Sequence, residues 1–330
     1  MTRPSTWPVL ALLRFALAAV VVSTHFYWFV PPGHPLRALV PLNAFAAVLG
    51  FLFVSGYSIA HSLRRRPDGF YVRRLVRIYP AYALAIVASL VPFWVARQSV
   101  IVCPLQDFKR PGLANVLINA VFGQTWVGGP LSSNAVVWTL AVEVACYAAA
   151  PLLLRLRTRT VLALLAVSAT AFAVYPHLHW FHYSLLKFGL PLLFLAWAWL
   201  AGFVYYALRD SVAATAMFIG GSALLVGLNV TDFPLGVATT AVSAAVLAVA
   251  PFVRLPGWCH RPMEWLGDLS YPLYLLHLPG IQLAWVLGVR NPYLWLAAAV
   301  ACGGLALILD GLLHVVIRRA RRPQFVPTAT

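Results

Sequence analysis

The amino-acid sequence predicts an all-α fold, a polytopic transmembrane helical bundle of about ten spans with both termini in the cytoplasm. Of its 330 residues, 62% are hydrophobic and 10% are charged, whereas an ordinary soluble domain has about 25% charged residues. Apolar runs recur along the whole chain, and each approaches the roughly 20 residues that a helix needs to cross a bilayer core. Because the runs are continuous rather than alternating in polarity, they predict helices and exclude a transmembrane β-barrel.

Ten candidate spans follow one another along the chain. They are residues 9–30, 39–62, 80–96, 134–154, 160–176, 188–208, 212–230, 234–253, 270–289 and 293–317. With the N-terminus in the cytoplasm, 17 of the 24 Lys and Arg residues fall in cytoplasmic connections and six in outer ones. This asymmetry is what the positive-inside rule requires, and it explains the formal net charge of +16 without a nucleic-acid partner.

The first span and the segments between the spans also carry structural signals. The first run carries Arg14 and is followed by many more spans, so it is expected to be a retained helix rather than a signal peptide. Residues 97–133 form the longest connection, in which a stretch near 113–122 is too short to span and fits a re-entrant or interfacial helix. The basic, aromatic segment 70–79 is expected in the cytoplasmic interface. We therefore predict one membrane domain, residues 1–322, and a short tail, residues 323–330.

Two ionisable side chains share one face of the first span. Arg14 and His25 are eleven residues apart, which at 100° per residue returns to within about 20° of full turns and places them about 16 Å apart along the helix. The structural alternative is a snorkelling arginine and a satisfied core histidine. A buried cation and an imidazole on one face favour a functional site.

Glu143 is the lone acid of an apolar run, with Thr139 and Tyr147 one turn before and after it. A lone carboxylate in lipid is either protonated or paired with another polar group. His25 and Arg14 are the expected partners of Glu143. A structural ion pair without a catalytic role is the alternative.

Three arginines crowd one side of the segment before the third span. Arg73 and Arg77 are four residues apart, and Arg74 and Arg77 three. Guanidinium groups suit bidentate binding of phosphate. Ordinary anchoring to lipid phosphates explains the same pattern.

A polar face opens the ninth candidate span. Ser270, Tyr274 and His277 share it by their spacing, and interhelical hydrogen bonding is the main alternative to a catalytic role. Earlier in the chain, the outer segment 177–183 holds three histidines without a metal-ligand pattern, so it fits an aromatic belt or a platform for a sugar ring. The four scattered cysteines also lack such a pattern, and no metal is expected.

Taken in order, these motifs resemble acyltransferase family 3, the integral membrane O-acyltransferases that modify bacterial surface polysaccharides and other hydroxyl compounds. Arg14 and His25 match the R-x10-H signature of that family, and four further segments resemble its other elements: residues 50–57, 70–82, 138–147 and 270–277. The chain departs from the family at Phe26, Thr139, Cys146 and Val144, the last of which stands where many relatives have a second acid. We expect no C-terminal hydrolase-like domain of the kind that some members carry.

The resemblance implies an acyl-CoA donor, most often acetyl-CoA, and a glycan or lipid-linked glycan acceptor at the bacterial inner membrane. His25 would be the general base, or would first form an acyl-imidazole, and Glu143 would orient it. Four arginines, Arg14, Arg73, Arg74 and Arg77, would hold the CoA phosphates. Ser270, Tyr274, His277 and Trp138 would line the substrate channel.

Two other classes of protein remain open. A polytopic transporter or glycan-lipid flippase without acyl chemistry would also need buried polar residues, but it usually shows inverted repeats, which we do not find in the sequence. A non-enzymatic lipid-binding scaffold would explain the basic segment but not a buried histidine and glutamate.

Overall fold

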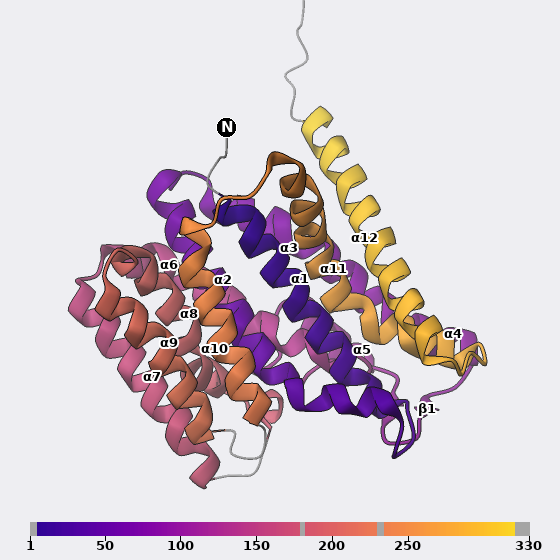
Figure 1. The fold of residues 1–330 in the computed structure, drawn as a ribbon. Coiled ribbons are helices and arrows are strands. Elements are labelled where there is room, and N and C mark those ends of the chain that lie inside the picture. Colours follow the sequence, from indigo (N-terminus) through magenta and orange to yellow (C-terminus); the bar gives the residue numbers. More distant parts are fainter. Residues whose placement is uncertain (1–4, 179–181, 230–233, 321–330) are drawn as a thin grey trace, which may run out of the picture.

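The computed structural model describes residues 5–178, 182–229 and 234–320, which form twelve α-helices and one two-stranded hairpin (Figure 1). The helices are α1 (Thr6–His25), α2 (Ala44–Arg65), α3 (Phe70–Ala88), α4 (Val91–Ala96), α5 (Leu113–Ala120), α6 (Thr139–Arg155), α7 (Thr158–Leu178), α8 (Leu190–Leu208), α9 (Val212–Asn229), α10 (Pro234–Val249), α11 (Gly257–Val286) and α12 (Pro292–Ala320). The strands β1 (Val100–Val102) and β2 (Asp107–Lys109) pair antiparallel. The predicted tail, residues 323–330, and residues 179–181 of the histidine-rich segment lie outside the described part.

The all-α membrane bundle is confirmed. In the described ranges, nine helical segments are long and apolar enough to cross a membrane, and they correspond to nine of the ten predicted spans. The remaining prediction, 270–289, largely coincides with the second half of α11, a 30-residue helix that packs against both α1 and α12. The orientation of the termini stays a prediction.

The start of the third helix differs from the sequence-based expectation, whereas the short helix expected near 113–122 is present. The segment 70–79, expected in the membrane interface, is the first half of α3, and the helix continues through Pro80. Gly69, with φ of +63°, precedes it, a conformation that glycine adopts without steric cost. The stretch near 113–122 forms α5, a helix of eight residues, which is far too short to span a bilayer.

Two glycines let α2 and α8 approach closely. A Cβ atom at Gly56 would lie 2.0 Å from the carbonyl oxygen of Trp199, and one at Gly202 would lie 2.1 Å from that of Phe53. Small residues permit such backbone contact between membrane helices. This contact fixes Ser55, the neighbour of Gly56, beside α8.

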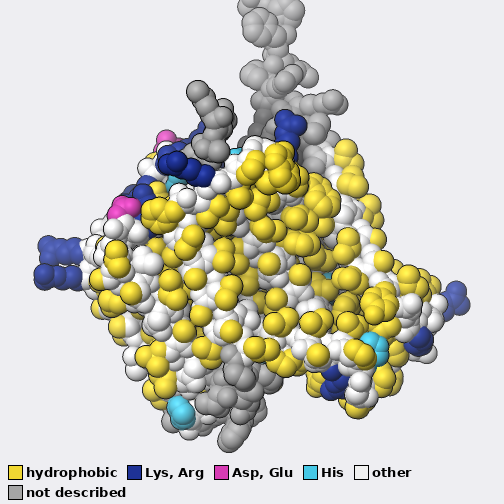
Figure 2. All heavy atoms as spheres, in the orientation of Figure 1, with side chains coloured by type: hydrophobic (Ala, Val, Ile, Leu, Met, Phe, Trp, Pro, Cys, Tyr) yellow, Lys and Arg dark blue, Asp and Glu magenta, His cyan; other side chains and the backbone are white. Residues whose placement is uncertain are grey.

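The surface matches the membrane prediction. Figure 2 shows one face, on which Lys and Arg gather at the upper left and lower right edges, and the band between them shows hydrophobic and other uncharged atoms without Lys, Arg, Asp or Glu. Long helices with an apolar outer surface are what a bilayer requires, because their backbone groups are satisfied internally.

Candidate active site

Two histidines meet where α1 ends against α11. The Nδ1 atom of His25 lies 2.9 Å from Nε2 of His277, and the two rings stack with centroids 5.1 Å apart. Trp28 also packs against His25, with ring centroids 4.5 Å apart. His277 is completely buried. The sequence predicted both histidines as site residues, but not their contact.

The surroundings of His277 determine how this pair is protonated. Its Nδ1 atom lies 2.8 Å from the carbonyl oxygen of Tyr274 and 3.2 Å from that of Leu273. Because carbonyl oxygens only accept, Nδ1 of His277 carries the proton, and in the neutral ring Nε2 is an acceptor. His25 therefore donates its Nδ1–H to His277, and within the described residues no donor bonds to the Nε2 atom of His25, which carries the lone pair of the neutral ring.

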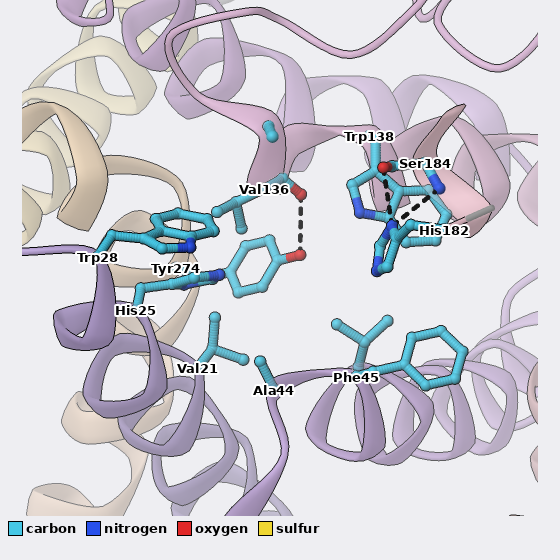
Figure 3. Close-up of a pocket in the computed structure, with 12 residues that line it drawn as sticks. Val21, His25, Trp28, Ala44, Phe45, Val136, Trp138, His182, Ser184 and Tyr274 are labelled. Carbon is cyan, nitrogen blue, oxygen red and sulfur yellow. Dashed lines mark hydrogen bonds between the residues drawn. The ribbon is translucent and has the colours of Figure 1, made fainter. Parts of the chain in front are cut away.

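His25, but not His277, borders a cavity of about 280 Å³. His25 and Tyr274 lie on one side of it, and His182 and Trp138 lie across the open space from them (Figure 3). The lining residues come from α1 and the turn that follows it, from α2 and α11, and from the segments before α6 and α8: Val21, His25, Trp28, Ala44, Phe45, Val48, Ala135, Val136, Trp138, His182, Ser184 and Tyr274. The predicted channel residue Trp138 is thus part of the cavity wall.

His182, one of the three histidines of the segment 177–183, for which the sequence predicts an aromatic belt or a sugar platform, lines this cavity. Its ring contacts Trp138 edge to face, with centroids 5.8 Å apart, and Phe45 in the same way at 6.4 Å. The backbone N–H of Ser184 donates to its Nδ1 atom over 3.2 Å, and the Ser184 hydroxyl lies 2.8 Å from that atom. The side chain of His182 remains exposed to solvent, and its partial desolvation lowers the pKa of His182, because desolvation disfavours the charged form.

The three predicted residues of α11 differ in what they do. The Tyr274 hydroxyl donates to the carbonyl oxygen of Val136 over 3.0 Å and lies 2.8 Å from the Thr139 hydroxyl. The ring of Tyr274 therefore lines the cavity, while its hydroxyl is already hydrogen-bonded within the protein. Ser270 donates to the carbonyl oxygen of Gly267 in its own helix over 2.6 Å. Only Tyr274 and His277 contribute to the site.

Glu143 lies in a separate polar network. It accepts hydrogen bonds from the hydroxyls of Ser55, over 2.7 Å, and Tyr147. The indole N–H of Trp199 donates to the Ser55 oxygen over 3.2 Å. The structure thus brings His277, and not Glu143, to His25.

Arginines gather near this network. Arg14 lies within electrostatic range of Glu143, Tyr147 and Arg77, and Arg74 lies within range of the same three groups. The Nε atoms of Arg14 and Arg74 are buried and have no hydrogen-bond partner within the described structure. Two guanidinium groups therefore keep a donor available in a place withdrawn from water, which is costly unless an anion binds there.

Arg73 is oriented differently. Its guanidinium donates to the backbone carbonyl oxygens of Asp68 and Arg66 in the turn before α3. Arg74 instead donates to the hydroxyl of Ser62 over 2.8 Å. Of the three arginines predicted on α3, Arg74 and Arg77 join Arg14, and Arg73 stabilises the preceding turn.

Across the described ranges, no three or more His, Cys, Asp or Glu side chains are grouped as metal ligands. The four cysteines are free thiols, of which Cys103 and Cys146 are buried.

Comparisons with known proteins indicate an acyltransferase. A family model described as an acyltransferase domain matches residues 8–312, which is nearly the whole chain. The chain is also similar to a curated protein of Komagataeibacter xylinus, the provisionally named membrane-bound transacylase BcsY. The two are 25% identical over 350 residues that cover 93% of this chain and 81% of that protein. No solved structure matches.

Proposed function

Since this chain belongs to the acyltransferase family whose model it matches, we propose that it is a membrane O-acyltransferase that moves an acyl group, in the simplest case acetyl, from acyl-CoA to a hydroxyl of a glycan acceptor. The observation that carries this proposal is the hydrogen bond between His25 and His277 beside a cavity. It supplies a positioned imidazole nitrogen with a free lone pair, which acyl transfer to a hydroxyl needs.

In this reaction His25 moves one proton. Its Nε2 atom takes the proton of the acceptor hydroxyl as the hydroxyl oxygen attacks the thioester carbonyl carbon. The resulting imidazolium is stabilised by its Nδ1–H···Nε2 hydrogen bond to His277. As the C–S bond of the tetrahedral intermediate breaks, the proton passes to the leaving sulfur. The products are an O-acyl ester and free CoA, and His25 is neutral again.

The donor phosphates are expected at the arginine cluster formed by Arg14, Arg74 and Arg77. Their charge and the unpartnered Nε atoms of Arg14 and Arg74 suit a phosphate or diphosphate group. Arg14 and His25 are about 16 Å apart along α1, from eleven steps of about 1.5 Å. A thioester arm extending from this cluster along α1 would reach His25.

Glu143 then has a role different from the one that the sequence predicted. It accepts hydrogen bonds from Ser55 and Tyr147 and lies within electrostatic range of Arg14 and Arg74. An anion in this position offsets the charge of the guanidinium groups while the donor site is empty. We therefore propose that Glu143 shapes the donor site rather than orienting His25.

The two ends of α1 suggest separate entrances. Arg14 lies toward the end of the bundle that charge asymmetry predicts to be cytoplasmic, where CoA esters are made, and the His25 cavity lies toward the other end. We propose that the donor enters from the cytoplasm of a bacterial cell and that the acceptor meets it from the outer side of the inner membrane.

A direct assay tests the proposal. Purified protein in proteoliposomes is incubated with [14C]acetyl-CoA and the cell-envelope fraction of a source strain that lacks the gene. We expect radioactivity in an alkali-labile ester of the glycan fraction, together with an equal amount of free CoA thiol. Movement of an envelope glycan without CoA release would indicate a transporter, and absence of both would refute the enzyme assignment.

A further inference from the structure

The mechanism leaves one side of the cavity without a role. His182 lies there, in the segment between α7 and α8 and across the cavity from His25 (Figure 3). It is held on two sides by the aromatic rings of Trp138 and Phe45 and through Nδ1 by Ser184. A ring fixed by so many contacts presents a defined group to the cavity.

The hydrogen bond from Ser184 determines which group that is. A backbone N–H only donates, so Nδ1 of His182 carries a lone pair. In the neutral imidazole the proton is then on Nε2, on the side of the ring away from Ser184, where Figure 3 shows the open cavity. Within the described residues no acceptor bonds to this nitrogen. The cavity therefore has a free acceptor on one side, His25 Nε2, and a free N–H donor on the other.

We propose that His182 is a positioning residue for the acceptor, and that its Nε2–H donates to an oxygen of a sugar or similar ring-shaped polyol whose reacting hydroxyl faces His25. This inference rests on the proposed acyltransferase function. Sugar rings combine an apolar C–H face with hydroxyl groups, and the cavity matches both features. Trp138 and Phe45 offer aromatic surface, and the two histidines offer a hydrogen-bond donor and an acceptor.

The size and location of the cavity favour the acceptor over the donor. Its volume of about 280 Å³ is near the lower end of the range for small-ligand pockets, about 300–1,000 Å³, which suits one ring. The arginine cluster that suits the donor phosphates lies toward the other end of α1. His182 is placed to contact the molecule that approaches His25 from the opposite direction.

Variants of His182 test this inference. His182→Asn keeps a side-chain oxygen that can accept from Ser184 N–H but removes the Nε2–H group, whereas His182→Gln places an amide N–H near the position of Nε2. His177→Asn is the matched control, because His177 is an exposed histidine like His182, lies at the end of α7 and does not line the cavity. Acetyl transfer is measured in proteoliposomes at saturating [14C]acetyl-CoA with increasing amounts of envelope fraction from the gene-deleted strain, and then with acetyl-CoA varied.

We expect His182→Asn to raise the half-saturating amount of acceptor about tenfold, the effect of one lost hydrogen bond, with the KM for acetyl-CoA changed less than about twofold. His182→Gln should recover part of the loss, and His177→Asn should behave as wild type. An unchanged acceptor curve for His182→Asn would overturn the inference, as would a lower kcat with both KM values unchanged, or a Gln variant no better than Asn. If the wild-type protein itself forms no acetyl ester, the proposed function fails instead.

Discussion

Replacing His277 tests the proton arrangement at the centre of the site. In the wild-type protein, His277 accepts the Nδ1–H of His25 over 2.9 Å and is itself fixed by two backbone carbonyl oxygens. During transfer His25 becomes an imidazolium, so this hydrogen bond becomes charge-assisted, with a worth of about 1.5–3 kcal/mol. Since about 1.4 kcal/mol is a tenfold change in rate, His277→Ala should lower kcat about 10- to 150-fold.

The assay is acetyl transfer under saturating donor and acceptor, with the unfolding temperature measured on the same preparations. His277→Gln is the matched variant, because its side-chain oxygen can accept from His25 Nδ1–H; it should retain a higher kcat than the alanine variant. A folded His277→Ala protein with wild-type kcat would refute the role of His277. Equal kcat values for the two variants would refute the hydrogen-bond argument, because the cavity left by alanine alone would then explain the loss.

Three further predictions concern the donor site, the helix contact and a buried thiol. Arg74→Gln should raise the KM for acetyl-CoA about tenfold. Arg73→Gln should change this KM less than about twofold, because the guanidinium of Arg73 already donates to the turn before α3. Equal effects of the two variants in steady-state kinetics would contradict the assignment of Arg74 to the donor site. Gly56→Ala should lower the unfolding temperature by several degrees, because its Cβ would lie 2.0 Å from a backbone oxygen of α8. Gly220→Ala should leave the unfolding temperature unchanged, because nothing lies within 4 Å of a Cβ at that position. Similar Tm values for the two variants would argue against the close contact between α2 and α8. Burial raises the pKa of Cys103 to about 12, so its thiol stays protonated at pH 8. Cys103 should therefore react with iodoacetamide only after denaturation in SDS. Labelling of the native protein at Cys103 as fast as at Cys259 would show that the Cys103 thiol is accessible.

The spans were predictable because bilayer crossing requires apolar length, and apolar length is visible in composition. Helix ends were less predictable, since hydropathy reports where a helix is apolar and not where it begins. α3 and α11 both start with polar, charged turns that continue a helix beyond its apolar part. The hairpin of β1 and β2 was missed because strands of three residues give no periodic signal.

The candidate site was predicted in part. Helical periodicity grouped Ser270, Tyr274 and His277 on one face of α11, and it singled out Arg14 and His25 on α1. Periodicity does not indicate which face of one helix meets which face of another, so the contact between His25 and His277 could not be derived. Opposite charges suggested a partner for Glu143, but the hydroxyls of Ser55 and Tyr147 satisfy this carboxylate instead.

His182 illustrates a different limit. The histidine-rich segment 177–183 indicated a belt or a sugar platform but no individual residue. Ser184, two residues after His182, has a backbone N–H that can reach Nδ1, and such turns are common in connections. What makes His182 interesting is its place across the cavity from His25, which depends on how α1, α2 and the segment before α6 pack. That arrangement has no signature in the sequence of the connection itself.

The central claim is that His25 is the base for acyl transfer, and one comparison tests it most directly. Wild-type protein and His25→Ala are reconstituted side by side, and acetyl ester formation from [14C]acetyl-CoA is measured with the same envelope acceptor. A positioned general base contributes about 100- to 10,000-fold, so the variant should lose at least about 100-fold in kcat while it still binds acetyl-CoA through Arg14 and Arg74. Full transfer activity in a folded His25→Ala protein would contradict the account.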